Sequence, residues 1–482
     1  MGKLGKFGLL AFVVVVGAAG CTKSNPISCV DGYCQDPAFP FCDSDGAIAG
    51  DPQTCIAVTC TPNSFAGCRM NQAIVCNAAG GNYDLSHCDN GCDPALGCVQ
   101  NSCIANTVSC GQRVVERCDE NGVLHTQACD LSCIETPAPH CAYISPKYLP
   151  DICDIEAVEP ARSVTAPETL DTATSSVCNG GVIPQVNAPE ICIVRYRTVT
   201  VTAAGAMRFV GTRAVAIVAD DTLSVNGRLD VSAQGQVGAP GSVRNVNASG
   251  GSSAPAVGGG GAGFSSSGAA GGSTTQPGGA TNGGPGFSPL VASSLGGGTI
   301  ASLNGPRRSD LGGGGGGALT LVSCRGSVNV TGVVEASGGG GLGGRTVLDA
   351  VGSFIAGGGG GGSGGYVVLQ GLHVAVSGAV YANGGSGGCG KPSTGAQGIN
   401  GADGRTSPPA ACVASSNEGS GGAGASSAFV PQVGGASSGG TPGGGGGAMG
   451  FFQAHTPIGI IPTLTPANAS PPFQQSLNVS TR

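Results

Sequence analysis

One short sequence pattern occurs three times in the second half of the chain, and long glycine-rich inserts separate its copies. The copies are TLSVNGRLDVS (222–232), SVNVTGVVEAS (327–337) and HVAVSGAVYAN (373–383). Apolar side chains fall at every second position of each copy, which is the period of a strand with one buried face. A shared glycine, at Gly227, Gly332 and Gly378, allows a tight turn between two short strands. The pattern therefore predicts short strands around a common core.

The length of a copy and the position of the inserts predict a β-solenoid. The stretch from Gly317 to Gly338 has the length of one rung, and repeats of this size must stack before their apolar faces are buried. Each insert leaves after the last strand of a copy, at Gly235, Gly338 or Gly384, and returns through glycine before the runs ALTLVS, YVVLQ and AMGFFQ. All inserts should therefore emerge from one side of a mainly β, glycine-rich, parallel β-helix-like domain over 190–456.

The inserts are rich in bare glycine, which loses more backbone freedom on ordering than any other residue. A flexible linker would not hold a fixed position relative to the strands, whereas these runs do. Polyglycine in extended left-handed helices packs closely against itself and against strand edges, because no side chain intervenes. We expect the runs to form an ordered or semi-ordered layer over one face of the β core. For the longest insert, 236–311, order and disorder are equally open.

Cysteine defines a second architecture in the first third of the chain, where 17 of the 23 cysteines lie between Cys29 and Cys153. Two units, 60–98 and 103–141, align at all six of their cysteines, and a differently spaced module precedes them at 29–60. Units of this size bury too little apolar surface to fold alone, so they need disulfides or metal.

We predict disulfides rather than a metal site, with a connectivity that spacing alone does not reveal. Cys88 and Cys92 have the separation of zinc ligands, as do Cys129 and Cys133, but zinc needs thiolates, which an oxidising compartment removes. The candidate disulfide cysteines are Cys29, Cys34, Cys42, Cys55, Cys60, Cys68, Cys76, Cys88, Cys92, Cys98, Cys103, Cys110, Cys118, Cys129, Cys133, Cys141, Cys153, Cys178 and Cys192. Small stapled modules of this kind are typical of spacers or binding units.

The N-terminus predicts export. Lys3 and Lys6 precede an apolar stretch and then small residues, which is the layout of a signal peptide over 1–20. The small residues before Cys21 resemble a bacterial lipobox, in which the cysteine is lipidated. Setting Cys21 aside leaves 22 of the 23 cysteines, an even number that can pair. We predict lipidation of Cys21, a tether over 21–28 and a place at the outer membrane or cell surface, with a soluble secreted chain as the alternative.

The remaining composition narrows the partners. A net charge of −7 and the lack of a basic cluster argue against nucleic acid. Residues 142–189 are predicted to form a linker, and 457–482 a Pro-containing C-terminal tail. The expected partners are a membrane, through the lipid anchor, and a glycan or protein of the cell envelope.

The stretches CVDGYCQDPAFPFCD, PKYLPDIC and GTRAVAIVADDTLSVNGRLDVSA resemble uncharacterised cell-surface lipoproteins of the myxobacterial type, which join a cysteine-rich front to a glycine-rich β back. This resemblance covers nearly the whole chain and implies a location but no activity. The frame GGGGGGALTLVS followed by VVEASGGGG is similar to the glycine-rich domain of the anaplastic lymphoma kinase receptor family, where strands alternate with bundled polyglycine helices. That second resemblance implies an alternative fold, a glycine-rich β-sandwich in which the Asn-Gly turns close hairpins.

Catalytic motifs carry little weight in this chain. The stretch GSGGCGKP nearly spells a phosphate loop, but Pro392 stands where a Ser or Thr is required. The nucleophile pattern G-x-S-x-G occurs at Ser363, Ser386 and Ser437, and three hits in glycine-serine text carry no information. Asp is too rare among the glycines for calcium-binding nonapeptide repeats.

The most serious enzyme hypothesis is a β-helix that cleaves polysaccharide, with Asp220, Asp221 and Asp230 as its carboxylates. Neighbouring residues on a strand point to opposite faces, so Asp220 and Asp221 would share a site only at a bend. We therefore predict no catalysis, no cofactor and no metal. The predicted role is that of a lipid-anchored structural or adhesive surface protein. A receptor module for glycan or protein is the first alternative, and the polysaccharide enzyme is the second.

Overall fold

The computed structural model describes residues 28–88, 91–95, 97–98, 103–120, 122–136, 138–150, 152–186, 188–244, 257–273, 299–300, 312–349, 352–395, 397–405, 409–474 and 477–482. These residues form strands and one short 3-10 helix, η1 (Ile152–Asp154). They fall into two compact units, one of Met1–Ser109 with Val115–Gln127 and one of Cys110–Val114 with Ala128–Arg482. The prediction of a mainly β chain is confirmed.

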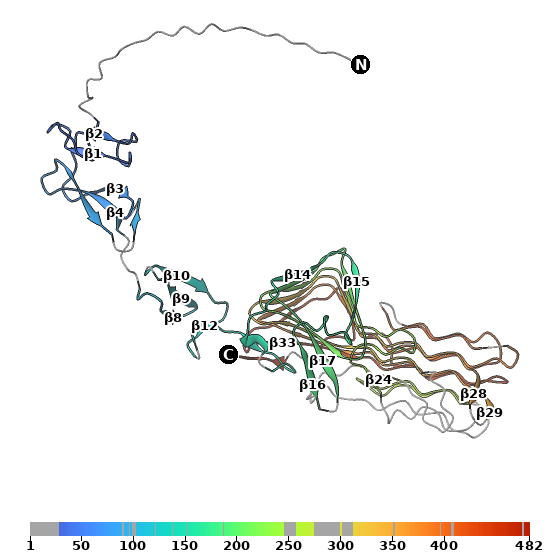
Figure 1. Ribbon diagram of the computed structural model, residues 1–482. Helices are drawn as coiled ribbons and strands as arrows, with labels where there is room; N and C mark the ends of the chain where they lie inside the picture. The colour runs from blue at the N-terminus through green and yellow to red at the C-terminus, as the bar shows by residue number, and fades with distance from the viewer. Residues whose placement is uncertain are drawn as a thin grey trace, which may run out of the picture. The chain divides into compact units, whose positions relative to one another are not determined.

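Short sheets make up the cysteine-rich region (Figure 1). In the first module, β1 (Phe41–Asp43) pairs with β2 (Thr54–Ile56). Each repeat then holds a three-stranded sheet followed by a two-stranded one. The strands of the first repeat are β3 (Phe65–Arg69), β4 (Gln72–Cys76), β5 (Tyr83–His87), β6 (Cys92–Asp93) and β7 (Gly97–Cys98). Those of the second are β8 (Val108–Cys110), β9 (Val114–Cys118), β10 (Leu124–Ala128), β11 (Cys133–Ile134) and β12 (His140–Cys141).

Eleven disulfides staple the chain, and the two repeats share one connectivity. In each repeat the first cysteine pairs with the third, the second with the fifth and the fourth with the sixth. The bonds are Cys60–Cys76, Cys68–Cys92 and Cys88–Cys98 in the first repeat, and Cys103–Cys118, Cys110–Cys133 and Cys129–Cys141 in the second. The other five are Cys29–Cys42, Cys34–Cys55, Cys153–Cys324, Cys178–Cys192 and Cys389–Cys412. The predicted disulfide framework is therefore present.

Three parallel sheets build the solenoid, which confirms the predicted fold over the β-sandwich alternative. The β14 sheet contains β14 (Ala161–Val164), β18 (Thr198–Val201), β21 (Leu223–Val225), β26 (Ser327–Val330), β31 (His373–Val376) and β34 (Thr463–Leu464). The β15 sheet contains β15 (Pro167–Asp171), β19 (Ala206–Val210), β22 (Arg228–Asp230), β27 (Val333–Glu335), β32 (Ala379–Tyr381) and β35 (Asn468–Ser470).

The third sheet, here the β17 sheet, has seven strands and opens with an antiparallel pair. Its strands are β16 (Val182–Gln185), β17 (Ala188–Tyr196), β20 (Ala214–Ala219), β25 (Ala318–Ser323), β30 (Tyr366–Gln370), β33 (Phe451–Thr456) and β36 (Leu477–Asn478). Each full rung takes one strand from the β17, β14 and β15 sheets in that order. The glycine-rich inserts follow β22, β27 and β32, which is where the sequence places them.

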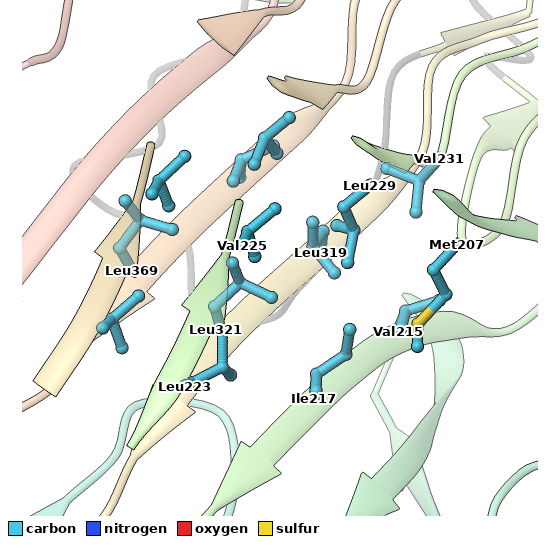
Figure 2. Close-up of a cluster of buried hydrophobic side chains, with 14 of the residues drawn as sticks. Met207, Val215, Ile217, Leu223, Val225, Leu229, Val231, Leu319, Leu321 and Leu369 are labelled. Carbon is cyan, nitrogen blue, oxygen red and sulfur yellow. The ribbon is translucent and has the colours of Figure 1, made fainter. Parts of the chain in front are cut away.

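The inward face of each strand fills one apolar core. Val225, Leu229 and Leu321 are among its members, and all three are fully buried (Figure 2). Side chains alternate along each strand, so inward Leu, Val and Ile positions alternate with outward polar ones. Burial of these stacked branched side chains at about 25 cal/mol per Å² is what holds the rungs together.

The solenoid extends beyond the predicted bounds at both ends. Residues 142–189, predicted as a linker, supply β13 (Ile144–Ser145), β14, β15 and β16. Residues 457–482, predicted as a tail, supply β34, β35, β36 and β37 (Ser480–Thr481). Both corrections have one physical reason. These strands are short, β15 and β16 contain proline, and their period-2 pattern is weak, so they are held by pairing with the stronger strands of the neighbouring rung.

One strap of chain, residues 142–154, packs on the outer face of the β17 sheet. Ile144 and Leu149 are buried there against Tyr366 and Val368. The C-terminus returns to the same strap, because β13 pairs with β37 and Arg482 forms an ion pair of 2.8 Å with Asp154. The chain end is thereby fastened to the start of the solenoid unit.

Candidate functional site

The glycine-rich inserts form a second ordered structure, in which hydrogen bonds recur at every third residue. Within 357–365, one set of N–H groups bonds a parallel neighbour, joining Gly358, Gly361 and Gly364 to the carbonyls of Pro442, Gly445 and Ala448. A second set bonds an antiparallel neighbour, joining Gly359, Gly362 and Gly365 to Leu342, Gly339 and Ala336. A three-residue period with bonds only to other segments is that of a left-handed polyproline II-type helix.

The segment 384–390 has the same geometry, with three different neighbours in rotation. The N–H groups of Gly384, Gly387 and Gly390 donate to the carbonyls of one neighbour, at Ala425, Gly422 and Gly419. The N–H groups of Gly385 and Gly388 donate to the carbonyls of a second neighbour, at Gly362 and Gly359. Those of Ser386 and Cys389 donate to the carbonyls of a third, at Ala402 and Ile399. Every backbone donor of the segment is thus satisfied by another insert segment. We call the set formed by 257–262, 313–317, 338–344, 357–365, 384–390, 398–404, 419–425 and 441–448 the polyglycine bundle. The expected ordered glycine layer is found in these described parts.

Glycine is required in the polyglycine bundle because of space. Gly361 has no positive φ, yet a Cβ added to it would overlap the carbonyl oxygen of Gly385. Added at Gly388, it would overlap the carbonyl oxygen of Leu342. The absence of side chains is what lets neighbouring segments come within hydrogen-bond distance. Most of the longest insert, 236–311, lies outside the described residues, so its order stays an open prediction there.

The polyglycine bundle projects from the solenoid and ends in an ordered group of loops (Figure 1). Seven residues separate Gly384 from Lys391, which at 3.1 Å per residue places the loops roughly 20 Å from the sheets. There the Thr441 N–H donates to the Lys391 carbonyl (2.8 Å), and the Lys391 N–H donates to Thr441 Oγ1 (2.6 Å). Asn417 Nδ2 donates to Ser393 Oγ (2.7 Å). We call the loops that carry Lys391, Ser393, Asn417, Glu418 and Thr441 the tip.

Glu418 organises one loop of the tip. Its carboxylate accepts hydrogen bonds from the backbone N–H and the hydroxyl of both Ser415 and Ser416, at 2.6–3.1 Å. Burial raises the pKa of this carboxyl, but the hydrogen bonds from Ser416 and Ser415 outweigh it and lower the pKa to about 2. The loop is therefore held in one conformation at any ordinary pH.

A hairpin extends the insert between 344 and 357. It is formed by β28 (Arg345–Asp349) and β29 (Gly352–Ala356), and Leu348 and Ile355 are 80% and 46% exposed on it. Thr441 Oγ1 donates to the carbonyl of Ala356 (3.4 Å), which ties the hairpin to the tip. Another two-stranded sheet pairs β23 (Val243–Arg244), near the start of the longest insert, with β24 (Thr299–Ile300), near its end.

Charged side chains form a row across the outer face of the β15 sheet. In register, Arg208 lies beside Asp230, Asp230 beside Glu335, and Glu335 beside Tyr381. Arg208 Nη1 lies 2.7 Å from Asp230 Oδ2, and Arg228 pairs with Glu335. Burial raises the pKa of the Glu335 carboxyl, with the Arg228 guanidinium opposing it and the charge of Asp230 reinforcing it. Glu335 is not one of the carboxylates that the enzyme hypothesis names, although it occupies the same position in its copy of the repeat as Asp230 does.

A small recess lies at the end of this row, between the last strand and the turn 426–429. Its volume is about 140 Å³. The side chains around it are Tyr381, Asn383, Ser426, Ser427, Asn468 and Ser470. All of them are uncharged, which distinguishes the recess from the charged row beside it.

The three aspartates of the enzyme hypothesis occupy separate environments. Asp220 is buried and forms an ion pair of 2.7 Å with Arg195 at the end of β20. Asp221 is exposed and lies 3.3 Å from Arg197. Asp230 belongs to the row on the β15 sheet. The structure therefore brings Asp230 together with Glu335, and not with Asp220 or Asp221.

The motifs that were set aside fall inside the polyglycine bundle and its tip. Ser363 and Ser386 lie in bundle segments, and Ser437 lies in a loop where its hydroxyl donates to the carbonyl of Gly440 (2.9 Å). A cluster of metal-ligand type, Cys29 with Cys34 and Cys55, consists of disulfide sulfurs.

The lipidation candidate, Cys21, lies outside the described residues, as do the predicted signal peptide and most of the tether. Within the described ranges, no helix has the length and apolar character needed to span a membrane. Eleven disulfides are typical of an exported protein in an oxidising compartment. Comparisons with protein-family models, curated proteins and solved structures found no match to the chain.

Proposed function

We propose that the protein is a lipid-anchored cell-surface protein with a structural or adhesive role, exerted through the polyglycine bundle and its tip. The observation that carries this proposal is the three-residue hydrogen-bond period of the bundle. Interlocked segments with satisfied backbone groups make a stiff projection. Short ordered loops on a rigid scaffold are the arrangement in which proteins present contact surfaces.

Apolar side chains near the tip favour adhesion. Leu348 and Ile355 are exposed on the hairpin that is fastened to Thr441. When an apolar surface covers these two side chains, their burial stabilises the contact by about 25 cal/mol per Å² of apolar area. The same side chains elsewhere on a surface would need no explanation, so it is their position that matters.

The anchor would be the lipid on Cys21, followed by the cysteine-rich modules as a spacer. The pairing of all 22 cysteines from Cys29 to Cys412 supports this, since it leaves Cys21 as the odd one of 23. The test is the intact mass of the membrane-extracted chain: a diacyl or triacyl mass on a chain beginning at Cys21 is expected. An unmodified cysteine there would overturn the anchor.

A non-catalytic role fits the charged side chains. Asp220 and Asp230 each bond a guanidinium at 2.7 Å, from Arg195 and Arg208 respectively. Carboxylates held in this way are occupied as hydrogen-bond acceptors, and they lie in different parts of the solenoid. The arrangement supports a structural reading of these residues over polysaccharide cleavage.

The adhesive role is tested by cells that carry the full-length chain. Retention of such cells on polystyrene is expected to exceed that of cells without it, and the pair L348S and I355S should remove most of the gain. The matched control is I458S with I461S, because these two isoleucines are 83% and 88% exposed on the solenoid instead of the hairpin. Equal retention with and without the chain, or equal loss in both double variants, would reject the adhesive role.

A further inference from the structure

We infer that the recess at the end of the β15 sheet binds one uncharged sugar residue of a glycan. This goes beyond the proposed function, since a structural projection that adheres through its tip needs no saccharide site. The recess lies on the outer face of the solenoid, at the opposite end of the inserts from the tip. The inference can therefore fail while the adhesive role stands, and the reverse also holds.

The floor of the recess is a fixed hydrogen-bond network. Ser470 Oγ donates to Asn383 Oδ1 (2.5 Å) and accepts from the Ser427 N–H (2.7 Å). Asn383 Nδ2 donates to the carbonyl of Arg405 (2.7 Å). Asn383 and Ser470 are 1% and 6% exposed, so their orientation is set by the protein before any ligand arrives. Such preorganisation lowers the entropic cost of binding.

The rim of the recess holds polar groups that are available to a ligand. Within the described part of the chain, the Tyr381 hydroxyl, the Asn468 amide and the Ser427 hydroxyl have no hydrogen-bond partner. A hydroxyl and an amide offer both donors and acceptors, which suits the vicinal hydroxyls of a sugar. The Tyr381 ring adds an apolar contact for the C–H face of a pyranose.

The neighbouring charges cancel, which favours an uncharged ligand. Beyond Tyr381 the row holds the guanidiniums of Arg208, Arg228 and Arg405 against the carboxyls of Asp230, Glu335 and Asp403. Three cations face three anions in one connected network, so the formal charges of the network sum to zero. The Glu335 carboxyl is the charge that acts on Tyr381, whose pKa is raised by burial and by this charge. An acidic or basic ligand would therefore lose its hydration without a counter-charge.

The size and the sheet edge argue for a sugar over a peptide. The volume of about 140 Å³ is below the roughly 300–1,000 Å³ of pockets for drug-sized ligands, and it suits a single ring. β35 is the last strand of the β15 sheet in the described part of the chain, where its outer edge has no paired strand. It is only three residues long, and Pro466, Pro471 and Pro472 flank it, which blunts pairing with a peptide strand.

The test is calorimetric titration of the purified full-length chain with methyl glycosides of glucose, galactose and N-acetylglucosamine. At least one should bind with Kd on the order of 1 mM, and Y381F and N468A should each weaken it about 3- to 10-fold, the loss of one hydrogen bond. N329A is the matched control, because Asn329 lies on the outer face of the β14 sheet and bonds Ser327. It should bind as the unmodified chain does.

Y381F removes one hydroxyl and Asn468 is exposed, so both variants are expected to fold, which circular dichroism checks. Methyl glucuronide and an alternating Thr-Val hexapeptide complete the panel. Absence of binding by every neutral glycoside at about 50 mM, roughly fifty times the expected Kd, overturns the inference. So does a preference for the glucuronide, binding of the peptide alone, or equal affinity in N468A and the unmodified chain.

Discussion

Cys153 and Cys324 are bonded to each other although 171 positions separate them in the chain. The bond joins the strap over the β17 sheet to the end of β25, and the Ile144 N–H donates to the carbonyl of Cys324 (2.9 Å) beside it. It therefore closes a loop that contains two complete rungs, β17 to β19 and β20 to β22. Every other disulfide among the described residues spans 24 positions or fewer.

Removing this bond should cost more stability than removing a short-range one. In the chain-entropy description, a loop of 171 residues gives about 5 kcal/mol, against about 3 kcal/mol for the 14-residue loop of Cys178–Cys192. The double variant C153A/C324A should lower the free energy of unfolding by about 2 kcal/mol more than C178A/C192A in urea denaturation. Equal losses would show that loop closure is not what this bond contributes.

The adjacent aspartates at the end of β20 should respond very differently to substitution. Asp220 is 2% exposed and pairs with the buried Arg195, so D220A leaves a buried guanidinium unpaired and should cost about 3–5 kcal/mol. Asp221 pairs with an exposed Arg197, and D221A should cost under about 1 kcal/mol. Chemical denaturation of both variants measures the difference. A small loss in D220A would contradict the structural role given to that ion pair.

Protonation of His455 in the unfolded chain should lower the stability of the protein in mild acid. Its ring is fully buried on β33, and a backbone interaction with Leu477 offsets only part of the effect of that burial on its pKa. Burial lowers its pKa to about 4, and the positive charge of Lys147 acts in the same direction. Between about pH 6.5 and pH 4 the unfolded chain binds a proton that the folded chain does not. Stability should therefore fall by roughly 3 kcal/mol as pH drops through this window.

The pH effect is checked by urea unfolding of the unmodified chain and of H455F at several pH values. H455F should flatten the decline, because phenylalanine fills a similar volume and takes up no proton. H373F serves as control, since His373 is exposed on β31. An unchanged slope in H455F would assign the acid sensitivity to other groups.

A single methyl group inside the polyglycine bundle should be destabilising. In G361A the added Cβ would overlap the carbonyl oxygen of Gly385, and overpacking of this kind costs about 1–3 kcal/mol. The control is G371A, in the turn after β30, where the nearest atom to the new Cβ is 3.1 Å away, so the neighbour has to shift less and the loss should be smaller than in G361A. Equal stability of the two variants would mean that the bundle is not close-packed at Gly361.

The sequence predicted the solenoid because its evidence is local and repeated. Alternation such as Leu223, Val225 and Leu229 marks one buried face, and the recurring glycine marks each turn. The ends were missed for the opposite reason: β14 and β35 lack a strong alternation and are ordered by the neighbouring rung. Pairing partners of cysteines such as Cys153 and Cys324 depend on three-dimensional proximity, which spacing in the chain does not reveal.

The candidate site was less predictable than the fold. Position in the repeat frame places Glu335 beside Asp230, so that pair was within reach of the sequence. The recess was not, because it joins the outer face of the last rung, at Asn468 and Ser470, to an insert turn at Ser426 and Ser427 that carries no repeat pattern. The three-residue period follows from the left-handed helices expected for polyglycine, but the neighbour that each N–H bonds was invisible, since a run of identical glycines has no internal pattern.

Hydrogen–deuterium exchange of the full-length chain tests the central claim most directly, because the bundle has to be an ordered, hydrogen-bonded projection. The six hydrogen-bonded amides of 357–365 and those of 384–390 should exchange as slowly as the amides of β20 and β25, and G361A should accelerate exchange in the bundle while leaving those strands protected. Exchange of the two glycine segments at the rate of an unstructured peptide would contradict the bundle, and with it the proposed role of the tip.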